Sequence, residues 1–150
     1  MHPQPLFMLR FIHASIYTII VALAAPLSAA TERLPPFFYC KSKSDKILEL
    51  YKQNNTISYK FGHPGRIPEL ELNRLVAEVD ILIGNATGSE LSNSITFTNG
   101  AYSYTVISRI NRMADVQIPE HGILVKKNSK YLTYTSCIPA SVRGSLLDIE

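Results

Sequence analysis

The sequence predicts an all-β domain, a small antiparallel sandwich or barrel of about seven or eight strands that is built from hairpins and holds one disulfide. Two observations favour this class. Two cysteines lie far apart in the chain, near the ends of the segment that is expected to fold. Polar dipeptides that suit tight turns also stand between runs of alternating apolar and polar residues. These dipeptides are Asn54-Asn55, Asn99-Gly100 and Asn128-Ser129.

The first thirty residues are typical of a secretory signal peptide. Arg10 supplies a positive flank, residues 11–27 are mostly apolar, and Leu27-Ser28-Ala29-Ala30 has the small residues of a cleavage site. We therefore expect cleavage after Ala30 or one residue earlier, and a periplasmic or secreted protein. The alternative is a membrane-spanning helix, which needs about 20 apolar residues. The small residues and the lack of a basic cluster after the apolar run favour cleavage.

Residues 31–150 are expected to fold as a single β domain. They hold 14 Lys and Arg, the 15 of the chain less Arg10, against 12 Asp and Glu, which leaves a net charge of +2. Because both signs are scattered along the chain, the composition does not indicate a nucleic-acid partner. After cleavage no apolar run is long enough to span a bilayer, so no membrane span is expected.

Cys40 and Cys137 are the two cysteines of the chain. In an exported protein such a pair favours one structural disulfide, which places the first and last strands side by side with their Cα atoms within about 7 Å. The alternative is two reactive or metal-binding thiols. Two cysteines without a neighbouring histidine make a poor zinc site, so we expect the disulfide and no metal.

The central hairpin is predicted by SITFTNGAYSYTVIS, residues 94–108. A type I′ turn at Asn99-Gly100 would pair Phe97 with Tyr102 and Ile95 with Tyr104, and would place all four side chains on one face. The two tyrosines are therefore expected to belong to the core face of this hairpin.

Two further hairpins follow from the same test. The turn at Asn54-Asn55 pairs Leu50 with Tyr59 and Leu48 with Phe61. The third hairpin is expected to turn at Asn128-Ser129. It pairs Val125 with Leu132 and Ile123 with Tyr134, and turns Lys126, Tyr131 and Thr133 away from the core.

Other segments give weaker signals. A first strand is expected over residues 37–42, and residues 61–68 are expected to form a loop because of their glycines and prolines. Residues 69–72 alternate like a strand, whereas residues 73–83 fit either a short helix or a further strand. Residues 109–122 are expected to form a long polar connection.

The sequence holds few candidates for catalysis. His63 and His121 lie in expected loops, where either could act as a base beside a carboxylate. Acidic side chains are expected to share strand faces in two pairs, Glu69 with Glu71 and Glu78 with Asp80, and the alternation favours solvated faces over an acid–base or metal site. We therefore predict no catalytic residue, no metal ligand and no cofactor.

The candidate binding surface consists of tyrosines and lysines on faces that are expected to point outward. Aromatic and cationic side chains on an exposed sheet face are typical of protein interfaces. The residues are Tyr51, Lys60, Lys126 and Tyr131.

Several blocks of the chain resemble small exported (periplasmic) bacterial proteins of unknown function. FYCKS and TFTNGAYSYTV carry the resemblance, which implies a periplasmic location and no particular activity. The chain also has a looser likeness to periplasmic inhibitors of lysozyme, which combine a signal peptide, a compact β-barrel and a disulfide. Those proteins insert a Ser-Gly-x-x-Tyr loop into the enzyme cleft, and this motif is not matched here. The nearest stretch is Thr87-Gly88-Ser89-Glu90, which lacks the tyrosine.

The sequence thus favours a non-enzymatic periplasmic binding or inhibitor-type module whose partner is an envelope or foreign protein. Two alternatives stay open: an envelope hydrolase that uses His63 or His121, and a structural or adhesin subunit that assembles through edge strands. The ligand and the oligomeric state do not follow from the sequence.

Overall fold

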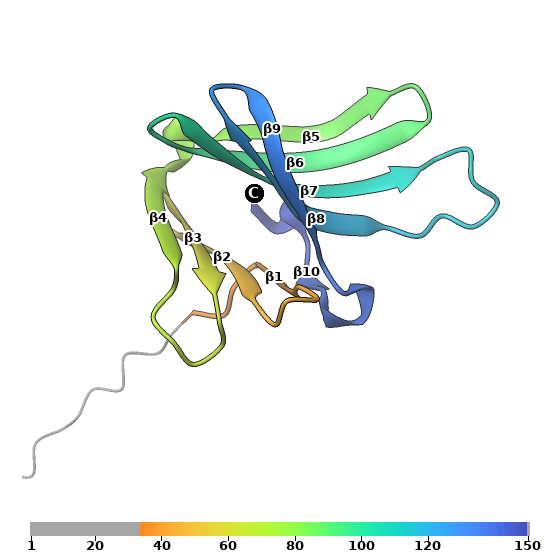
Figure 1. Ribbon diagram of the computed structural model, residues 1–150. Coiled ribbons are helices and arrows are strands. Elements are labelled where there is room, and N and C mark those ends of the chain that lie inside the picture. Colours follow the sequence, from red (N-terminus) through yellow and green to blue (C-terminus); the bar gives the residue numbers. More distant parts are fainter. Residues whose placement is uncertain (1–33, 150) are drawn as a thin grey trace, which may run out of the picture. The chain divides into compact units, whose positions relative to one another are not determined.

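A computed structural model describes residues 34–149, which form ten strands in two antiparallel sheets (Figure 1). The first sheet has the order β10-β1-β2-β3-β4 and the second has the order β5-β6-β7-β8-β9. The strands are β1 (Phe38–Lys41), β2 (Ile47–Gln53), β3 (Thr56–Gly62), β4 (Leu70–Leu75), β5 (Asp80–Thr87), β6 (Glu90–Asn99), β7 (Tyr102–Asn111), β8 (Glu120–Lys127), β9 (Lys130–Ser136) and β10 (Arg143–Gly144). Three short 3₁₀ turns complete the domain: η1 (Val76–Glu78), η2 (Pro139–Ser141) and η3 (Leu146–Ile149).

The all-β class is confirmed, with ten strands in place of the expected seven or eight. The predicted signal peptide lies outside the described residues. Among residues 34–149 no helix is long and apolar enough to cross a membrane.

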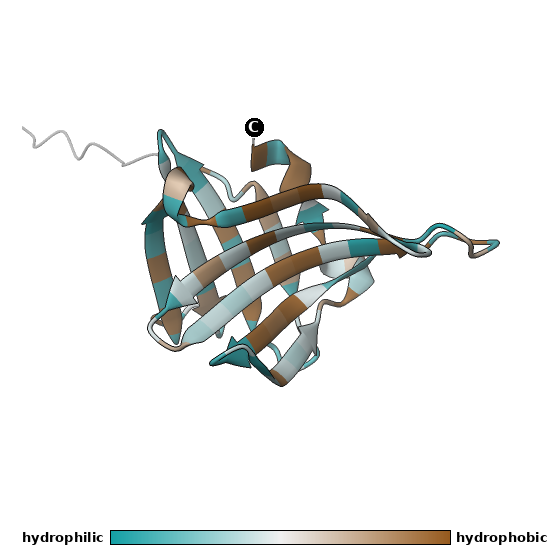
Figure 2. Ribbon diagram, turned by 90° about the horizontal axis from the view of Figure 1, so that it is seen from above, coloured by the Kyte–Doolittle hydropathy of each residue, from teal (hydrophilic) through white to brown (hydrophobic). Residues whose placement is uncertain are grey.

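The core lies between the two sheets, because β1 to β8 each contribute apolar side chains to it. Hydrophobic and hydrophilic residues alternate along many of the strands (Figure 2). The ring of Tyr59 in the first sheet lies 5.4 Å from that of Phe97 and 6.0 Å from that of Tyr104 in the second. Full burial of one large apolar side chain contributes about 1.5–3 kcal/mol. Contacts between the sheets therefore hold the two layers together, and the outer faces of the sheets point away from each other.

The hairpin of β2 and β3 has the predicted register. Leu50 is the Cα partner of Tyr59, and Leu48 is that of Phe61. Asn54 has a φ of 54°, which asparagine tolerates better than most residues at a tight turn. The alternation of apolar and polar residues was enough to predict this pairing, because no bulge interrupts either strand.

The central hairpin of β6 and β7 keeps its predicted faces, but the predicted turn is wrong by one residue. The two-residue loop is Gly100-Ala101, since Asn99 pairs with Tyr102 and Phe97 with Tyr104. Only Gly100 of the two loop residues has a positive φ, 59°, which fits a type II′ turn with glycine first rather than type I′. The shift preserves the alternation, so Ile95 and Phe97 are fully buried as expected.

In the hairpin of β8 and β9 the turn is right and most of the pairing is wrong. Asn128 and Ser129 both have positive φ, as type I′ requires. Beyond the pair of Lys126 with Tyr131, Leu132 is an extra residue in β9. This bulge brings Thr133, rather than Leu132, opposite Val125 and leaves Leu132 exposed. Likewise Ile123 pairs with Thr135 and Leu124 with Tyr134.

Two segments that the sequence left weakly defined are ordered. Residues 73–83 continue as strand to Leu75, form the 3₁₀ turn η1 and enter β5 at Asp80. The expected connection over 109–122 is shorter than predicted, since β7 runs to Asn111 and β8 begins at Glu120. The loop that joins them spans only residues 112–119.

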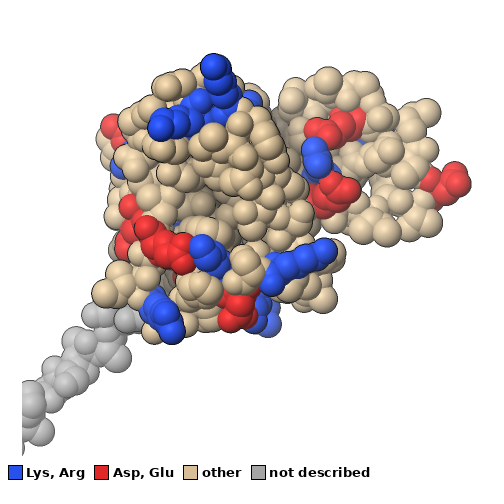
Figure 3. Space-filling view, viewed as in Figure 1, with Lys and Arg blue, Asp and Glu red and all other residues tan. Residues whose placement is uncertain are grey.

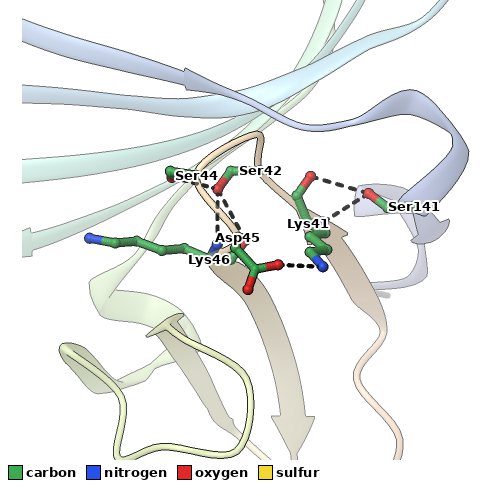
Figure 4. Close-up of polar contacts among 6 residues, drawn as sticks. All are labelled: Lys41, Ser42, Ser44, Asp45, Lys46 and Ser141. Atoms are coloured by element: carbon green, nitrogen blue, oxygen red, sulfur yellow. Dashed lines mark hydrogen bonds and ion pairs between the residues drawn. The ribbon is translucent and has the colours of Figure 1, made fainter.

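The disulfide between Cys40 and Cys137 is confirmed, with Cα atoms 5.7 Å apart. It joins β1 of the first sheet to the end of β9 in the second, where Ser42 and Cys137 form an isolated bridge. Hydrogen bonds around it hold the C-terminal segment to β1 (Figure 4). The Ser141 hydroxyl accepts from the Lys41 backbone N–H at 2.9 Å and donates to the Ile138 carbonyl at 2.6 Å.

Candidate binding surfaces

Tyr51 and Lys60, the first half of the predicted surface, lie together on the outer face of the first sheet. The ammonium of Lys60 lies 5.6 Å from the centre of the Tyr51 ring. The same ammonium is 3.2 Å from a carboxylate oxygen of Glu71 on β4. Lys60 is thus already engaged on both sides, and a ligand at this face would compete with the carboxylate for it.

Lys126 and Tyr131, the second half, are Cα partners on the outer face of the second sheet. Tyr131 is exposed. Because the two sheets face each other through the core, these two residues point away from Tyr51 and Lys60. The structure therefore brings the four residues together as two separate pairs, not as one patch.

His63 lies in the loop after β3, as predicted. Its Nε2 atom is 3.7 Å from a carboxylate oxygen of Glu69. The other oxygen of that carboxylate accepts a hydrogen bond from Lys46 at 2.6 Å, and this bond is the main cause that lowers the pKa of Glu69. The nearest carboxylate to His63 is therefore already paired with a lysine.

His121 was expected in a loop, and that expectation is wrong because it lies in β8. Its ring centre is 5.8 Å from that of the buried Phe38, between the sheets. Its Nδ1 atom is buried and has no hydrogen-bond partner among the described residues. Burial lowers the pKa of His121 below its usual value of 6.5. The ring thus contacts the core, and the neutral form is the one that this position favours.

We expect the stability of the domain to fall as the pH drops below about 6.5, because of His121. The lowered pKa means that the unfolded chain binds this proton more readily than the folded chain. Its contribution is therefore fully present above pH 6.5 and is lost as the pH falls through the lower pKa of the folded state. Urea midpoints at pH 7.5, 6.5 and 5.5 measure this slope. His121→Phe should flatten it, whereas His63→Gln on the surface should leave it in place; equal slopes in both variants would contradict the assignment.

The predicted carboxylate pairs have separate roles. Glu69 contacts Lys46, and Glu71 contacts Lys60. Glu78 accepts a hydrogen bond from the backbone N–H of Leu75 at 2.9 Å and so closes the turn η1. Within the part of the chain that the structure describes, no three His, Cys, Asp or Glu side chains gather as they would around a metal ion.

The loop of residues 112–119, here called the β7–β8 loop, is a candidate surface that the sequence did not predict. It extends beyond the ends of its two strands, next to the turn between β5 and β6 (Figure 1). Three large apolar side chains on it face solvent: Met113 is 80% exposed, Val116 71% and Ile118 64%. Isolated exposed apolar residues are common, but three within six positions form a group that indicates a contact surface.

The base of the β7–β8 loop is held by Arg109, the third residue from the end of β7. Its guanidinium contacts the carboxylate of Glu120 on β8 at 3.1 Å and that of Glu90 on β6 at 3.4 Å. It also lies 5.6 Å from the centre of the Tyr134 ring on β9. Four neighbouring strands are therefore tied together beneath the loop, each surface contact contributing little alone.

Hydrogen bonds also order the β7–β8 loop itself. Arg112 donates from its backbone to Ser89 at 2.8 Å and from its guanidinium to the Gly88 carbonyl at 2.6 Å, so the loop is bound to the β5–β6 turn. The backbone N–H of Met113 donates to the Asn111 side chain at 3.0 Å, and the Gln117 amide donates to the Arg112 carbonyl at 3.3 Å. The apolar side chains are thus carried on a backbone that is ordered before any partner arrives.

The sequence did contain a signal for this loop. Apolar Met113, Val116 and Ile118 are interleaved with polar residues and followed by Pro119, in a segment too short for a strand pair of its own. Whether such residues turn inward or outward depends on the tertiary structure, so alternation alone did not identify them.

The residues that could bind a partner thus come from the β7–β8 loop and from the two outer pairs, and no relative of the chain adds to this assignment. Comparison with protein-family models, with curated proteins and with solved structures gave no match.

Proposed function

We propose that this chain is a non-enzymatic binding protein of the inhibitor type, exported to the periplasm or beyond, and that the β7–β8 loop enters a recess of a partner protein. The observation that carries the proposal is the exposure of Met113, Val116 and Ile118 on a hydrogen-bonded loop. The disulfide supports an oxidising compartment, because disulfides persist there and are rare in the cytosol.

The energetics favour a contact through this loop. Burial of each of the three side chains in an apolar recess is worth about 1.5–3 kcal/mol. Binding also costs the ordering of loops and side chains at an interface. Because Arg112 already fixes the loop against the β5–β6 turn, less of that cost remains at the moment of binding.

The charges near the loop define the partner further. The loop and its base carry three acidic residues, Glu90, Asp115 and Glu120, against Arg109 and Arg112. In Figure 3 the end of the domain that extends to the right shows charged groups side by side amid a mostly uncharged surface. The loop itself carries one charge of each sign, Arg112 and Asp115, so it lacks the cluster of basic residues that anionic lipid surfaces attract. We therefore propose a protein partner with an apolar recess and a basic side chain at its rim that meets Asp115.

The shape of the sheet edges favours this function over assembly of a structural subunit. The two edge strands of the second sheet, β5 and β9, each contain a bulge. In β5 the bulge includes Gly84, whose φ is 67° and whose N–H donates to the Asn93 side chain at 2.8 Å. Bulges interrupt the flat row of backbone groups that another chain needs for edge pairing.

A competition experiment tests the proposal. The full chain, with a photo-crosslinking residue in place of Val116, is exposed to envelope extract. A second protein that lacks the crosslinker, either the wild type or a variant, is added as the competitor. The double variant Met113→Ser/Ile118→Ser is expected to compete at least about 100-fold less well than the wild type, since two buried apolar side chains are lost. The variant should unfold at the same temperature as the wild type, because both side chains are exposed.

The matched control removes two exposed apolar side chains far along the chain from the loop. Ile67 is 91% exposed and Leu147 is 50% exposed, so Ile67→Ser/Leu147→Ser makes the same chemical change elsewhere. This control should compete as well as the wild type. Equal competition by both double variants, or adducts of equal yield from a crosslinker at Asn55, would show that the loop is not the contact element.

A further inference from the structure

Met113 supplies the accessible sulfur of the described domain. Cys40 and Cys137 are joined in the disulfide and are only 2% and 7% exposed. The other two methionines of the sequence, Met1 and Met8, fall in the expected signal peptide. An oxidant that reaches the domain formed by residues 34–149 therefore meets one exposed thioether, that of Met113 in the β7–β8 loop.

We propose that Met113 is a site of reversible oxidation that switches the β7–β8 loop between an apolar and a polar form. The oxidant is a peroxide, as an oxidising compartment can supply. The inference rests on the proposed function for its consequence, because the polar form would bind the partner recess less well. The modification itself depends only on the exposure of the sulfur and on the burial of the two cysteines.

The chemistry is a two-electron oxygen transfer. The thioether sulfur attacks one oxygen of hydrogen peroxide, and the O–O bond breaks as an S–O bond forms. The proton of the transferred oxygen passes to the departing hydroxide, which leaves as water. Sulfur is oxidised by two electrons and peroxide is reduced by two, so no further reactant is needed. The product, methionine sulfoxide, is polar and is returned to methionine by sulfoxide reductases.

The surroundings of Met113 explain why oxidation would alter binding and not folding. The side chain projects into solvent, and only its backbone N–H is engaged, through the Asn111 side chain at 3.0 Å. That hydrogen bond does not involve the sulfur, so the loop keeps its backbone after oxidation. The new S–O dipole would, however, have to be desolvated in an apolar recess without a donor.

Binding and oxidation should also affect each other reciprocally. If the partner binds the reduced loop better than the oxidised loop, the bound partner must disfavour oxidation by the same factor. Met113 would also be covered sterically in the complex. The partner is therefore expected to slow the oxidation of Met113.

The test uses the full mature chain and hydrogen peroxide. Peptide mass spectrometry should find a gain of about 16 Da on Met113, and sulfoxide reductase should remove it. The unfolding temperature should not change. In the crosslinking competition, the oxidised protein and Met113→Gln should compete about tenfold less well than the untreated protein, because one apolar side chain has become polar. Met113→Leu has no sulfur at this position and should compete equally well with and without peroxide treatment.

Each other result has a definite meaning. If Met113 stays unmodified at a peroxide dose that oxidises an equal concentration of free methionine, the modification site is overturned. If Met113 is oxidised and the oxidised protein competes as well as the untreated protein, the switch is overturned, while binding through the loop stands. If Met113→Ser/Ile118→Ser itself competes like the wild type, the proposed function fails and the switch with it, whereas the mass measurement still decides the modification site.

Discussion

Replacement of Cys40 and Cys137 together by alanine is expected to lower the free energy of unfolding by about 4 kcal/mol, which corresponds to a drop of roughly 15 °C in Tm. The disulfide closes a loop of 97 residues in sequence and links β1 of the first sheet to the end of β9 in the second. Without it, the unfolded chain regains the freedom that the long closed loop removes. Since small domains are stable by only about 5–15 kcal/mol, the loss is a large part of the total.

The disulfide prediction has an internal control. The wild type should lose about the same stability in excess dithiothreitol, and the double variant should be insensitive to the reductant. Urea unfolding with and without reductant gives all four values. A double variant within about 1 kcal/mol of the oxidised wild type would show that the contacts around β1, such as those of Ser141, hold the sheets together on their own.

Gly144→Ala is expected to lower the free energy of unfolding by about 3 kcal/mol, as the sum of a backbone cost and a clash. Gly144 has a φ of 72°, and an added Cβ would lie 2.0 Å from the carbonyl oxygen of Phe37. The alanine would therefore push β10 away from β1, where Phe38 is the Cα partner of Gly144.

Gly65→Ala is the matched control, because Gly65 has nearly the same φ, 71°, but no atom within 4 Å of the added Cβ. Its cost should be the backbone cost alone, about 1–2 kcal/mol. Urea unfolding of the two variants separates the terms. Equal losses would mean that β10 does not pack against β1 as the structure has it.

The sequence predicted the fold class, the disulfide and one complete hairpin, and the errors elsewhere have physical causes. Alternation determines which face a residue takes, so the buried positions of Ile95 and Phe97 were correct even though the turn was not. The turn itself was ambiguous, because glycine suits the first place of a type II′ turn as well as the second of type I′. In β9 the alternation continues through Leu132, so nothing in the pattern revealed the bulge there.

His121 was misplaced for a different reason. Pro119 and Gly122 flank it, and both residues usually indicate a loop. In the structure Gly122 lies inside β8, where an added Cβ would be 2.5 Å from the ring of Tyr134. A tyrosine of the neighbouring strand occupies the space that a side chain at Gly122 would need. The contact between Gly122 and Tyr134 depends on the register of β8 with β9. The predicted register was wrong there because of the bulge in β9.

The candidate site was harder to predict than the fold. The four outward residues were assigned to outer faces correctly, but the sequence could not tell that Tyr51 and Tyr131 belong to different sheets. The β7–β8 loop was missed because exposure of Met113 and its neighbours depends on how far the loop extends beyond the sheet. Arg109 on β7 likewise forms ion pairs with residues of β6 and β8, which lie near each other only in the folded chain.

Identification of the partner peptide that a crosslinker at Val116 captures tests the proposed function most directly. The account predicts one peptide, lost when wild-type competitor is present, that lines an apolar recess of a single protein with an Arg or Lys at the rim. In that complex Asp115→Lys should weaken binding more than Asp115→Asn, because it reverses the charge that meets the rim. Adducts scattered over many proteins, or one peptide from a flat and acidic surface, would contradict the account.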